Sequence, residues 1–430
     1  MMASPFKILV LSEVRGDTRR FRTFHPYEQL SLAGVPCRLS HLTHPALLEL
    51  VSQAEMVIFH RTAWDGYVEK LFQITPLAIL DVDDLIFEPD AFQWIDSPDF
   101  QEPLRAALYR GEMRRQRDTL DACQAVIAST DFLADQVRQM GKPAWVHRNA
   151  FSLEMLKLSE QAYQHGQADP SRVIIGYASG TPTHDRDFAV VKPALKHIMQ
   201  QYPQVELWLV GSLNPGRDWG NLAGRVKRFP WMPWRKLPAL LVQFDINLAP
   251  LVMDNPFAQS KSEIKYMEAA LLRVPTIASP TDAFQYAIRA GENGFLAANL
   301  HEWAEALDVL VSQPDVRKAV GDNAYAHTLA NYHPSTRSGE LIATLNQISE
   351  QQLGKALIMP LHAAEGEPVS SNHTPSNIGY LIDPALERSP SLAQMALYSL
   401  KYRGLRTLLV QLWIYFRRLL APIFPYKSDD

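Results

Sequence analysis

Short apolar runs alternate with longer amphipathic stretches along the first 150 residues. The apolar runs predict strands at 7–11, 56–59, 77–80 and 125–128. The amphipathic stretches predict helices at 25–33, 104–123 and 130–140. Strands that alternate with helices in this way favour a parallel sheet covered on both faces.

The alternation begins again after a polar, helical stretch at 152–169. Strands are predicted at 173–177, 206–210, 244–248 and 276–278. Helices are predicted at 187–201, 263–272, 303–312, 316–331 and 335–352, the first of them kinked or restarted at Pro193. We therefore expect an α/β protein with two sheet domains, at 1–150 and 151–352. Residues 353–390 are predicted to be a linker, because they are rich in Pro, Ser, Asn and Gly.

Composition narrows the class of protein. The chain has 430 residues and a net charge of −4, which gives no electrostatic case for a nucleic-acid partner. Two cysteines cannot form a disulfide framework or a cysteine-rich zinc site. No secretory leader and no apolar run of about 18 residues is present, so we expect a cytoplasmic location.

Candidate chemistry follows the strands of the second domain. The turn after 173–177 holds Ser179, Gly180 and Thr181, small residues whose backbone N–H groups can approach an anion beside a helix N-terminus. This turn is a possible diphosphate site, although small residues also join strands to helices in proteins without one. Further along, Lys261, Lys265 and Glu268 fall at i, i+4 and i+7 and are predicted to share one helix face. Two cations and a carboxylate suit a nucleotide diphosphate, and the alternative is a solvated face with an internal ion pair.

These segments resemble a known family. Glu-Ala-Ala at 268–270 followed by Val-Pro-Thr-Ile-Ala at 274–278 looks like a signature of glycosyltransferase family 4 (the group 1 glycosyl transferases). Residues 288–296 and 244–250 are similar to two further segments of that family. The resemblance covers about 170–335 well and 1–150 more loosely.

The resemblance implies a GT-B architecture, in which two Rossmann-like domains face each other across a cleft. It places a UDP-, GDP- or dTDP-linked sugar donor on the C-terminal domain and the acceptor on the N-terminal one. It also implies transfer with retention, without a cofactor or a required metal, and it makes Glu268 the residue that binds the donor ribose.

Two departures from the family pattern concern the donor site. Ser260 stands where the family has the first Glu of its E-x7-E pair, and Lys261 beside it is expected to take over that contact. Thr181 and Arg186 stand where the family has a phosphate-binding Arg and Lys. We therefore expect Lys261 and Arg186 to act in catalysis.

The N-terminal half must then supply the acceptor side. Arg15 belongs to an arginine-rich loop after the first strand, which is either a binding loop or a solvated one. His60 follows another strand and is our prediction for the group that orients the acceptor or accepts its proton. Asp84 ends an Asp-Val-Asp-Asp cluster that suggests a metal site in other folds, and we expect it to bind acceptor hydroxyls or to cap a helix.

The last segment, 391–430, has a different pattern. Leucines and basic residues separate onto two sides of a predicted helix over 391–425, without an acidic residue. Such a helix either lies on the inner-leaflet surface of a membrane or docks on the protein.

Together these features predict a hexosyltransferase that acts on a glycan or lipid-linked acceptor in cell-surface polysaccharide or glycoconjugate synthesis. The alternatives are a sugar-nucleotide epimerase of the same fold and a non-catalytic, membrane-peripheral partner of a polysaccharide-assembly complex.

Overall fold

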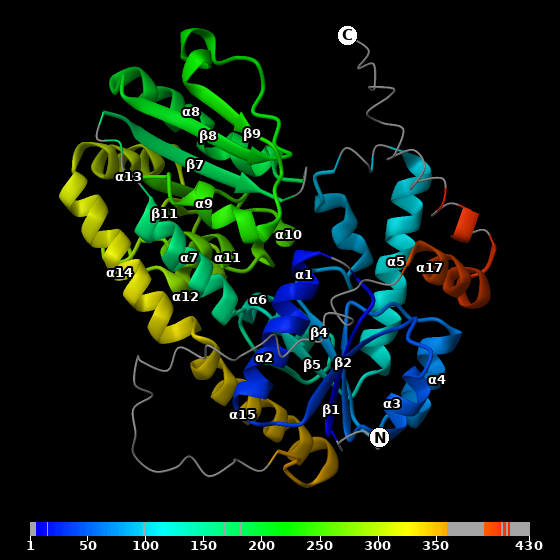
Figure 1. The fold of residues 1–430 in the computed structure, drawn as a ribbon. Coiled ribbons are helices and arrows are strands. Elements are labelled where there is room, and N and C mark those ends of the chain that lie inside the picture. Colours follow the sequence, from blue (N-terminus) through cyan, green and yellow to red (C-terminus); the bar gives the residue numbers. More distant parts are fainter. Residues whose placement is uncertain are drawn as a thin grey trace, which may run out of the picture.

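A computed structural model of the chain describes residues 6–14, 16–97, 100, 102–166, 169, 171–180, 183–358, 391–405, 407–409 and 412. It consists of two α/β domains that face each other, with each sheet covered by helices on both faces (Figure 1). The predicted fold class, GT-B with two Rossmann-like parallel-sheet domains and a C-terminal helical extension, agrees with this architecture.

The N-terminal sheet has six parallel strands in the order β2-β1-β3-β4-β5-β6. The strands are β1 (Ile8–Ser12), β2 (Cys37–His41), β3 (Met56–His60), β4 (Ala78–Val82), β5 (Ala125–Ala128) and β6 (Ala144–Val146). Every residue of β1, β3, β4 and β5 is buried, which is why these strands read as continuous apolar runs. The edge strands β2 and β6 are only partly buried, so they carry no such run and were not predicted.

Helices cover the two faces of this sheet unequally. One face packs against α3 (Leu47–Gln53), α4 (Gly66–Ile74), α5 (Pro103–Ala122) and α6 (Asp131–Gln139). The other face packs against α2 (His25–Leu32) and a helix from the far end of the chain, α15 (Pro334–Leu353). Two short elements, α1 (Asp17–Arg19) and a π-helix at Arg20–Phe24, lead from β1 into α2. A 3-10 helix at Pro89–Trp94 lies between β4 and α5.

The C-terminal sheet also has six parallel strands, in the order β12-β11-β10-β7-β8-β9. The strands are β7 (Val173–Ser179), β8 (Val205–Gly211), β9 (Val226–Phe229), β10 (Ile246–Ala249), β11 (Thr276–Ala278) and β12 (Phe295–Leu296). Here too, the strands that the sequence did not predict, β9 and β12, are poorly buried, since neither contains a fully buried residue.

The helices of this domain pack around its sheet in the same way. The elements are α7 (Leu153–His165), α8 (Asp185–Gln201), two 3-10 helices (Gly220–Arg225 and Trp234–Lys236), α9 (Leu237–Leu241), α10 (Pro256–Gln259), α11 (Ile264–Ala270), α12 (Asp282–Ala287), α13 (Leu300–Ser312) and α14 (Pro314–Tyr332). One face packs against α8 and α13, and the other against α7, α9 and α11. Helix α8 continues through Pro193, where the sequence predicted a kink or a restart.

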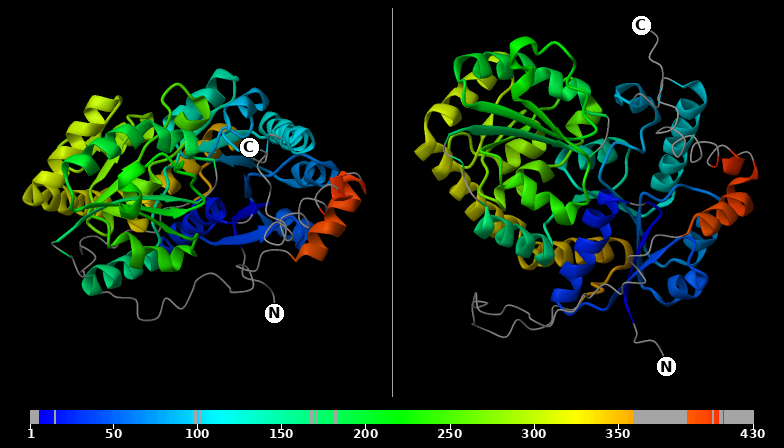
Figure 2. Two further views of the ribbon diagram at one scale, coloured as in Figure 1. Left: turned by 90° about the horizontal axis from the view of Figure 1, so that it is seen from above. Right: turned by 45° about the horizontal axis from the view of Figure 1, so that its top comes forward.

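The chain crosses back to the N-terminal domain after α14. We expected residues 335–352 to close the C-terminal domain, but the apolar face of α15 packs on the N-terminal sheet through Leu341, Leu345 and Ile348. Figures 1 and 2 show α15 beside α2. The two domains are therefore joined twice, once by the chain before α7 and once by the turn between α14 and α15.

The C-terminal extension lies against the N-terminal domain. It contains α17 (Leu392–Tyr398) and a π-helix at Ser399–Arg403, and both views of Figure 2 place it at the end of the molecule remote from the C-terminal domain. Arg406 and residues 413–430, which the predicted amphipathic helix includes, lie outside the described residues. Among the described helices, none has the length and apolar character that crossing a bilayer requires.

Candidate functional site

The strand order of the C-terminal domain predicts where a ligand binds. The chain runs from β7 outward to β9 and then returns to β10 on the other side of β7, so the connections diverge between β7 and β10. In open α/β sheets, such a switch point leaves a crevice beyond the carboxyl ends of the two strands. The loops at this place are 180–184 after β7 and 250–255 after β10.

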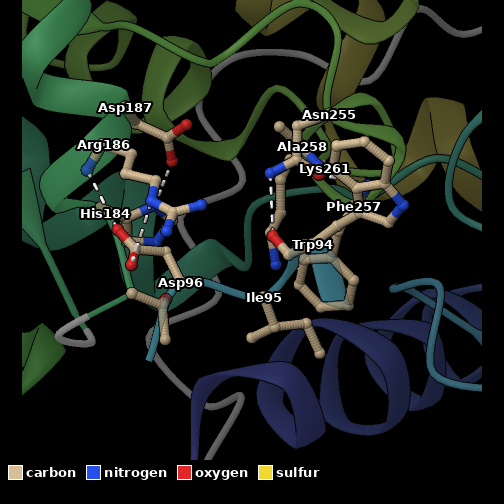
Figure 3. A pocket seen from close by; sticks show the side chains of 11 residues that line it. Trp94, Ile95, Asp96, His184, Arg186, Asp187, Asn255, Phe257, Ala258 and Lys261 are labelled. Carbon is tan, nitrogen blue, oxygen red and sulfur yellow. Dashed lines mark hydrogen bonds and ion pairs between the residues drawn. The ribbon is translucent and has the colours of Figure 1, made fainter. Parts of the chain in front are cut away.

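A pocket opens at this crevice, between the two domains. Its C-terminal-domain wall contains Thr183, His184, Arg186, Asp187, Asn255, Phe257, Ala258 and Lys261. Its N-terminal-domain wall contains Trp94, Ile95 and Asp96. Figure 3 shows Arg186, His184 and Asp96 on one side and Lys261, Phe257 and Trp94 on the other. A small polar ligand held here would contact both domains.

Lys261 reaches across the cleft from the turn between α10 and α11. Its Nζ lies 2.7 Å from Asp84 Oδ1 and 4.3 Å from the centre of the Phe257 ring. The prediction that Lys261, Lys265 and Glu268 share one helix face was wrong for Lys261, because α11 begins only at Ile264. The turn sends Lys261 towards the pocket, whereas Lys265 and Glu268 remain together on the helix.

Lys265 lies directly behind the turn that follows β7. Its Nζ donates a hydrogen bond to the Ala178 carbonyl and lies 4.8 Å from the centre of the Tyr177 ring. Burial lowers the pKa of Lys265 to about 8, because few polar groups replace its hydration. The ammonium of Lys265 thus contacts the residue before Ser179 and supplies positive charge at the turn that was predicted to bind an anion.

Glu268 lies beside a second, more apolar hollow. The hollow is lined by Met155, Ser159, Trp234, Leu237, Pro238, Leu241 and Glu268. Burial raises the pKa of Glu268 despite a neighbouring guanidinium, that of Arg20, whose Nη2 lies 3.6 Å from Glu268 Oε1. Arg20 also lies 4.6 Å above the Trp234 ring. A carboxylate next to an aromatic wall is a suitable arrangement for a ribose with its attached base.

Ser179 and Gly180, at the end of β7 and the start of the following turn, have different surroundings. Ser179 is buried, and a Cβ on Gly211 would lie 1.9 Å from the Ser179 carbonyl oxygen. Gly180 is exposed and has open space around it. Thr181 lies outside the described residues, as does Arg15 on the acceptor side. The strand end is thus fixed by close backbone packing, and Gly180 directly after it is exposed.

Ser260, at the first position of the family's glutamate pair, does not face the pocket. It is fully buried, and its hydroxyl donates to the Phe257 carbonyl at 2.7 Å. The next carboxylate, Glu263, is also buried and accepts a hydrogen bond from the Tyr332 hydroxyl at 2.9 Å. The donor-sugar contact that the family assigns to a glutamate here therefore has no carboxylate counterpart at either position, and Lys261 is the charged side chain that reaches the pocket.

Arg186 lies at the pocket, but it is largely exposed. Its side chain is 72% exposed, its Nε lies 3.5 Å from Asp96 Oδ1, and its backbone N–H donates to Asp96 Oδ2 at 3.2 Å. His184 is more enclosed, and its Nδ1 lies 2.8 Å from Asp187 Oδ2. Burial lowers the pKa of His184 below its usual value. The sequence analysis did not single out His184, although it directly precedes a helix after a strand.

Four further pocket residues were missed. Trp94 ends a 3-10 helix, and Asp96 and Asn255 lie in loops; none of these segments has a recognisable motif. Asp187 looked like an ordinary acidic residue in the first turn of a helix. Asn255 donates to the Trp94 carbonyl at 2.9 Å, so the two loops meet across the cleft. No pattern within either loop identifies a contact between residues so far apart in sequence.

The N-terminal sheet has its own switch point, between β1 and β3. His60 ends β3 and is fully buried, with Nδ1 3.0 Å from Ser12 Oγ and Nε2 3.6 Å from Asp83 Oδ1. In this conformation His60 cannot contact an acceptor, contrary to its predicted role. Its imidazole lies beside the Asp83 carboxylate instead.

Asp83 and Asp84 are held by Arg61. The Arg61 backbone has a φ of 45°, a conformation uncommon for non-glycine residues, and its Nε donates to Asp83 Oδ1 at 2.6 Å. Burial alone would raise the pKa of Asp83, but the Arg61 guanidinium outweighs it and holds the pKa well below its usual range. Asp84 pairs with both Arg61 and Lys261 and therefore links the two domains. Neither residue caps a helix, because the next helix begins at Pro89 with Glu88 at its N-cap.

The first carboxylate of the Asp-Val-Asp-Asp cluster is structural. Asp81 forms two hydrogen bonds with Arg22, at 2.8 and 2.7 Å, and both side chains are buried. Arg20 and Arg22 of the arginine-rich segment lie in the π-helix and are buried and paired with carboxylates, so these two are not solvated. Among the described residues, no group of three or more His, Cys, Asp and Glu side chains is arranged to hold a metal ion.

Comparison with known proteins supports the resemblance seen in the sequence. Residues 172–313 match the model of the family described as glycosyl transferases group 1, and no curated protein sequence matches the chain. The match spans β7 to α13 and contains Lys261, Lys265 and Glu268. It confirms the resemblance and supports a glycosyltransferase.

Solved structures share the whole two-domain arrangement. HepE of Anabaena in complex with UDP and glucose is 15% identical, with 80% of this chain and 100% of that chain covered and a TM-score of 0.53. Sucrose-phosphate synthase from Thermosynechococcus elongatus is 15% identical, with the same coverage and a TM-score of 0.55. A glycosyltransferase from Rickettsia africae is 13% identical, with 80% and 99% covered and a TM-score of 0.54. At these identities the likeness is one of fold, and it confirms the GT-B prediction.

Proposed function

We propose that this protein is a glycosyltransferase that transfers a hexose-like sugar from a nucleoside diphosphate to an acceptor hydroxyl, with retention. The C-terminal domain binds the donor and the N-terminal domain presents a glycan or lipid-linked acceptor. The main support is the placement of two lysines at the switch point of a sheet that matches the group 1 glycosyl transferases: Lys265 contacts the end of β7, and Lys261 lines the pocket.

The diphosphate would lie on the turn at Ser179 and Gly180. The backbone N–H groups after β7 and the ammonium groups of Lys261 and Lys265 can neutralise its charge. The ribose would bind Glu268, and the base would lie in the apolar hollow beside Trp234. UDP is the first nucleotide to test, because HepE, which shares the fold, was crystallised with it.

Bond cleavage places negative charge on the leaving diphosphate and positive charge on the anomeric carbon. Lys261 and Lys265 stabilise the first of these charges, which is the most demanding requirement of the step. The departing phosphate oxygen takes the proton from the acceptor hydroxyl, so no pair of enzymic carboxylates is needed. Closure of the two domains over the pocket excludes water and limits hydrolysis of the donor.

On the acceptor side, we assign Asp84 to contacts with the acceptor or the donor sugar. It belongs to the N-terminal domain and pairs with Lys261, which lines the pocket. His60 acts through Asp83 as a positioning residue, because it is fully buried.

The proposal is tested by calorimetric binding of UDP, GDP, dTDP and ADP to the purified chain, first with EDTA and then with Mg²⁺. We expect one nucleotide to bind with EDTA present, and Glu268→Ala to weaken its affinity by about tenfold or more, because hydrogen bonds to a charged partner are lost. Glu305→Ala is the matched control, since this exposed carboxylate on α13 lies outside the pocket. Unchanged affinity in Glu268→Ala contradicts the ribose assignment. Absence of binding by all four nucleotides contradicts the transferase and favours a non-catalytic partner.

A further inference from the structure

The C-terminal extension is fixed to the N-terminal domain by buried polar contacts. The Tyr398 hydroxyl donates to the two carboxylate oxygens of Asp65 at 3.1 and 2.9 Å. Arg403 Nε donates to Asp65 Oδ2 at 3.1 Å, and the other arm of the guanidinium pairs with Glu13. Because Arg403 is buried and holds two carboxylates, this docking is specific.

Aromatic rings complete the attachment. Tyr402 stacks on Tyr67 with ring centres 4.8 Å apart, and Tyr398 meets the edge of Tyr67 at 5.9 Å. These tyrosines belong to or pack against the core of the N-terminal domain. The extension is therefore part of the folded domain over the described residues.

The attachment lies at the switch point of the N-terminal sheet. Glu13 follows β1, Asp65 follows β3, and the Ala63 N–H donates to Glu13 at 3.0 Å. Burial raises the pKa of Glu13 to about 7, which Arg403 partly opposes. The extension is thus anchored beside the carboxyl ends of the two strands that flank this switch point.

The other side of the extension is covered with exposed leucines. The exposed fractions are 50% for Leu392, 68% for Leu397, 46% for Leu400, 59% for Leu405, 56% for Leu409 and 37% for Leu412. We call these six residues the leucine surface. They follow one another within a short segment whose tyrosines face the protein, and such clustering marks an interaction site.

Charge indicates what covers the leucine surface. No Asp or Glu occurs from 391 to 428, whereas six basic residues occur, Lys401, Arg403, Arg406, Arg417, Arg418 and Lys427. Only Arg403 among the described ones is held by carboxylates of the protein. An identical second copy would bring these positive charges together, while an anionic lipid surface accepts both the cations and the leucines.

We infer that the leucine surface binds an anionic lipid bilayer and holds the N-terminal domain against it through the contacts to Asp65 and Glu13. Membrane binding by the leucine surface does not require that the protein be a glycosyltransferase. If the protein is the proposed glycosyltransferase, membrane binding further implies that its acceptor is carried by a lipid, and this step rests on the proposed function.

The test measures flotation of the full-length chain with phosphatidylcholine vesicles, with and without about 30% phosphatidylglycerol, in the absence of nucleotide. We expect binding to the anionic vesicles and a loss of about tenfold or more in the Leu397→Asp/Leu400→Asp variant, since two leucines no longer enter the interface. Leu300→Asp is the control, because this leucine is 53% exposed on α13 of the other domain. A second measurement covers the case in which the double variant undocks. A bimane label on Leu397→Cys should be quenched by brominated lipid, and the same label on Leu300→Cys should not.

Absence of vesicle binding overturns the inference, and so does binding that survives the double substitution together with an unquenched label at position 397. A wild-type dimer in solution that dissociates in the double variant also overturns it, because a second copy then occupies the leucine surface. Nucleotide binding without vesicle binding would leave the proposed function intact. The reverse result would leave the leucine surface intact and remove the transferase.

Discussion

The ion pair between Lys261 and Asp84 makes an unusual prediction, namely that removing a carboxylate tightens nucleotide binding. Lys261 Nζ lies 2.7 Å from Asp84 Oδ1. A diphosphate that uses Lys261 must displace or share this contact, and it also meets the negative charge of Asp84. Asp84→Asn removes both penalties.

The size of the effect follows from distance and exposure. The side chains of Lys261 and Asp84 are 26% and 13% exposed, so the pair is neither fully screened nor fully desolvated. Coulomb attraction at this distance is about 6 kcal/mol at an effective dielectric of about 20, most of which is offset by desolvation. A net difference of about 1–2 kcal/mol corresponds to an affinity gain of about 5- to 30-fold.

The assay is calorimetric titration of wild type, Asp84→Asn, Lys261→Ala and the double variant with the nucleotide that binds best. The gain from Asp84→Asn should disappear in the Lys261→Ala background, because the cycle isolates the coupling between the two residues. Asp131→Asn is the matched control, since Asp131 also pairs with an arginine of the N-terminal domain, Arg148, whereas only Asp84 of the two pairs with Lys261. Unchanged or weaker nucleotide affinity in Asp84→Asn refutes the competition between Asp84 and the phosphate.

Three further predictions concern charge and packing around the site. Nucleotide affinity should fall as the pH rises through about 8, the pKa of Lys265, because the ammonium loses its proton. Titrations from pH 6.5 to 9 measure this dependence, which should be absent in Lys265→Met. Burial raises the pKa of Glu28 to about 7, so its contribution to stability is present below about 4.5 and lost as the pH rises to about 7. Thermal melts should therefore show Glu28→Gln gaining about 1–3 kcal/mol at pH 8 over its effect at pH 4.5, and equal effects at both pH values would contradict this. Gly211→Ala should lower the melting temperature by several degrees and weaken nucleotide binding. The reason is that the new Cβ would lie 1.9 Å from the Ser179 carbonyl oxygen and that a φ of 93° disfavours a side chain. Gly224→Ala is the control, because Gly224 has open space around it.

The sequence predicted the strands that are buried on both faces and missed those that are not. The runs in β1, β3, β4 and β5 are apolar because helices cover both sides of the sheet. β9 is half-exposed, and β12 has only two residues, so neither has a distinctive periodicity. The path of α15 was also unpredictable, since an amphipathic helix fits either sheet and tertiary packing decides between them.

The candidate site was predicted where local spacing determines geometry. Lys265 and Glu268 lie together because a helix brings i and i+3 to one side. Lys261 departs from this face because the chain forms two separate helices, α10 and α11, around it. Its partner Asp84 is 177 residues away in sequence, and no pattern in either segment predicts their contact.

Ion pairs across the cleft occur repeatedly, and in two of them the C-terminal domain supplies the cation. Lys261 and Arg186 of the C-terminal domain pair with Asp84 and Asp96 of the N-terminal domain. Glu268 pairs in the opposite sense, with Arg20. The groups proposed to bind the donor are therefore paired with charges of the facing domain, which avoids burying unpaired charge. Under the proposed function, the donor competes with the facing domain for these same groups, so its binding is expected to weaken the ion pairs across the cleft.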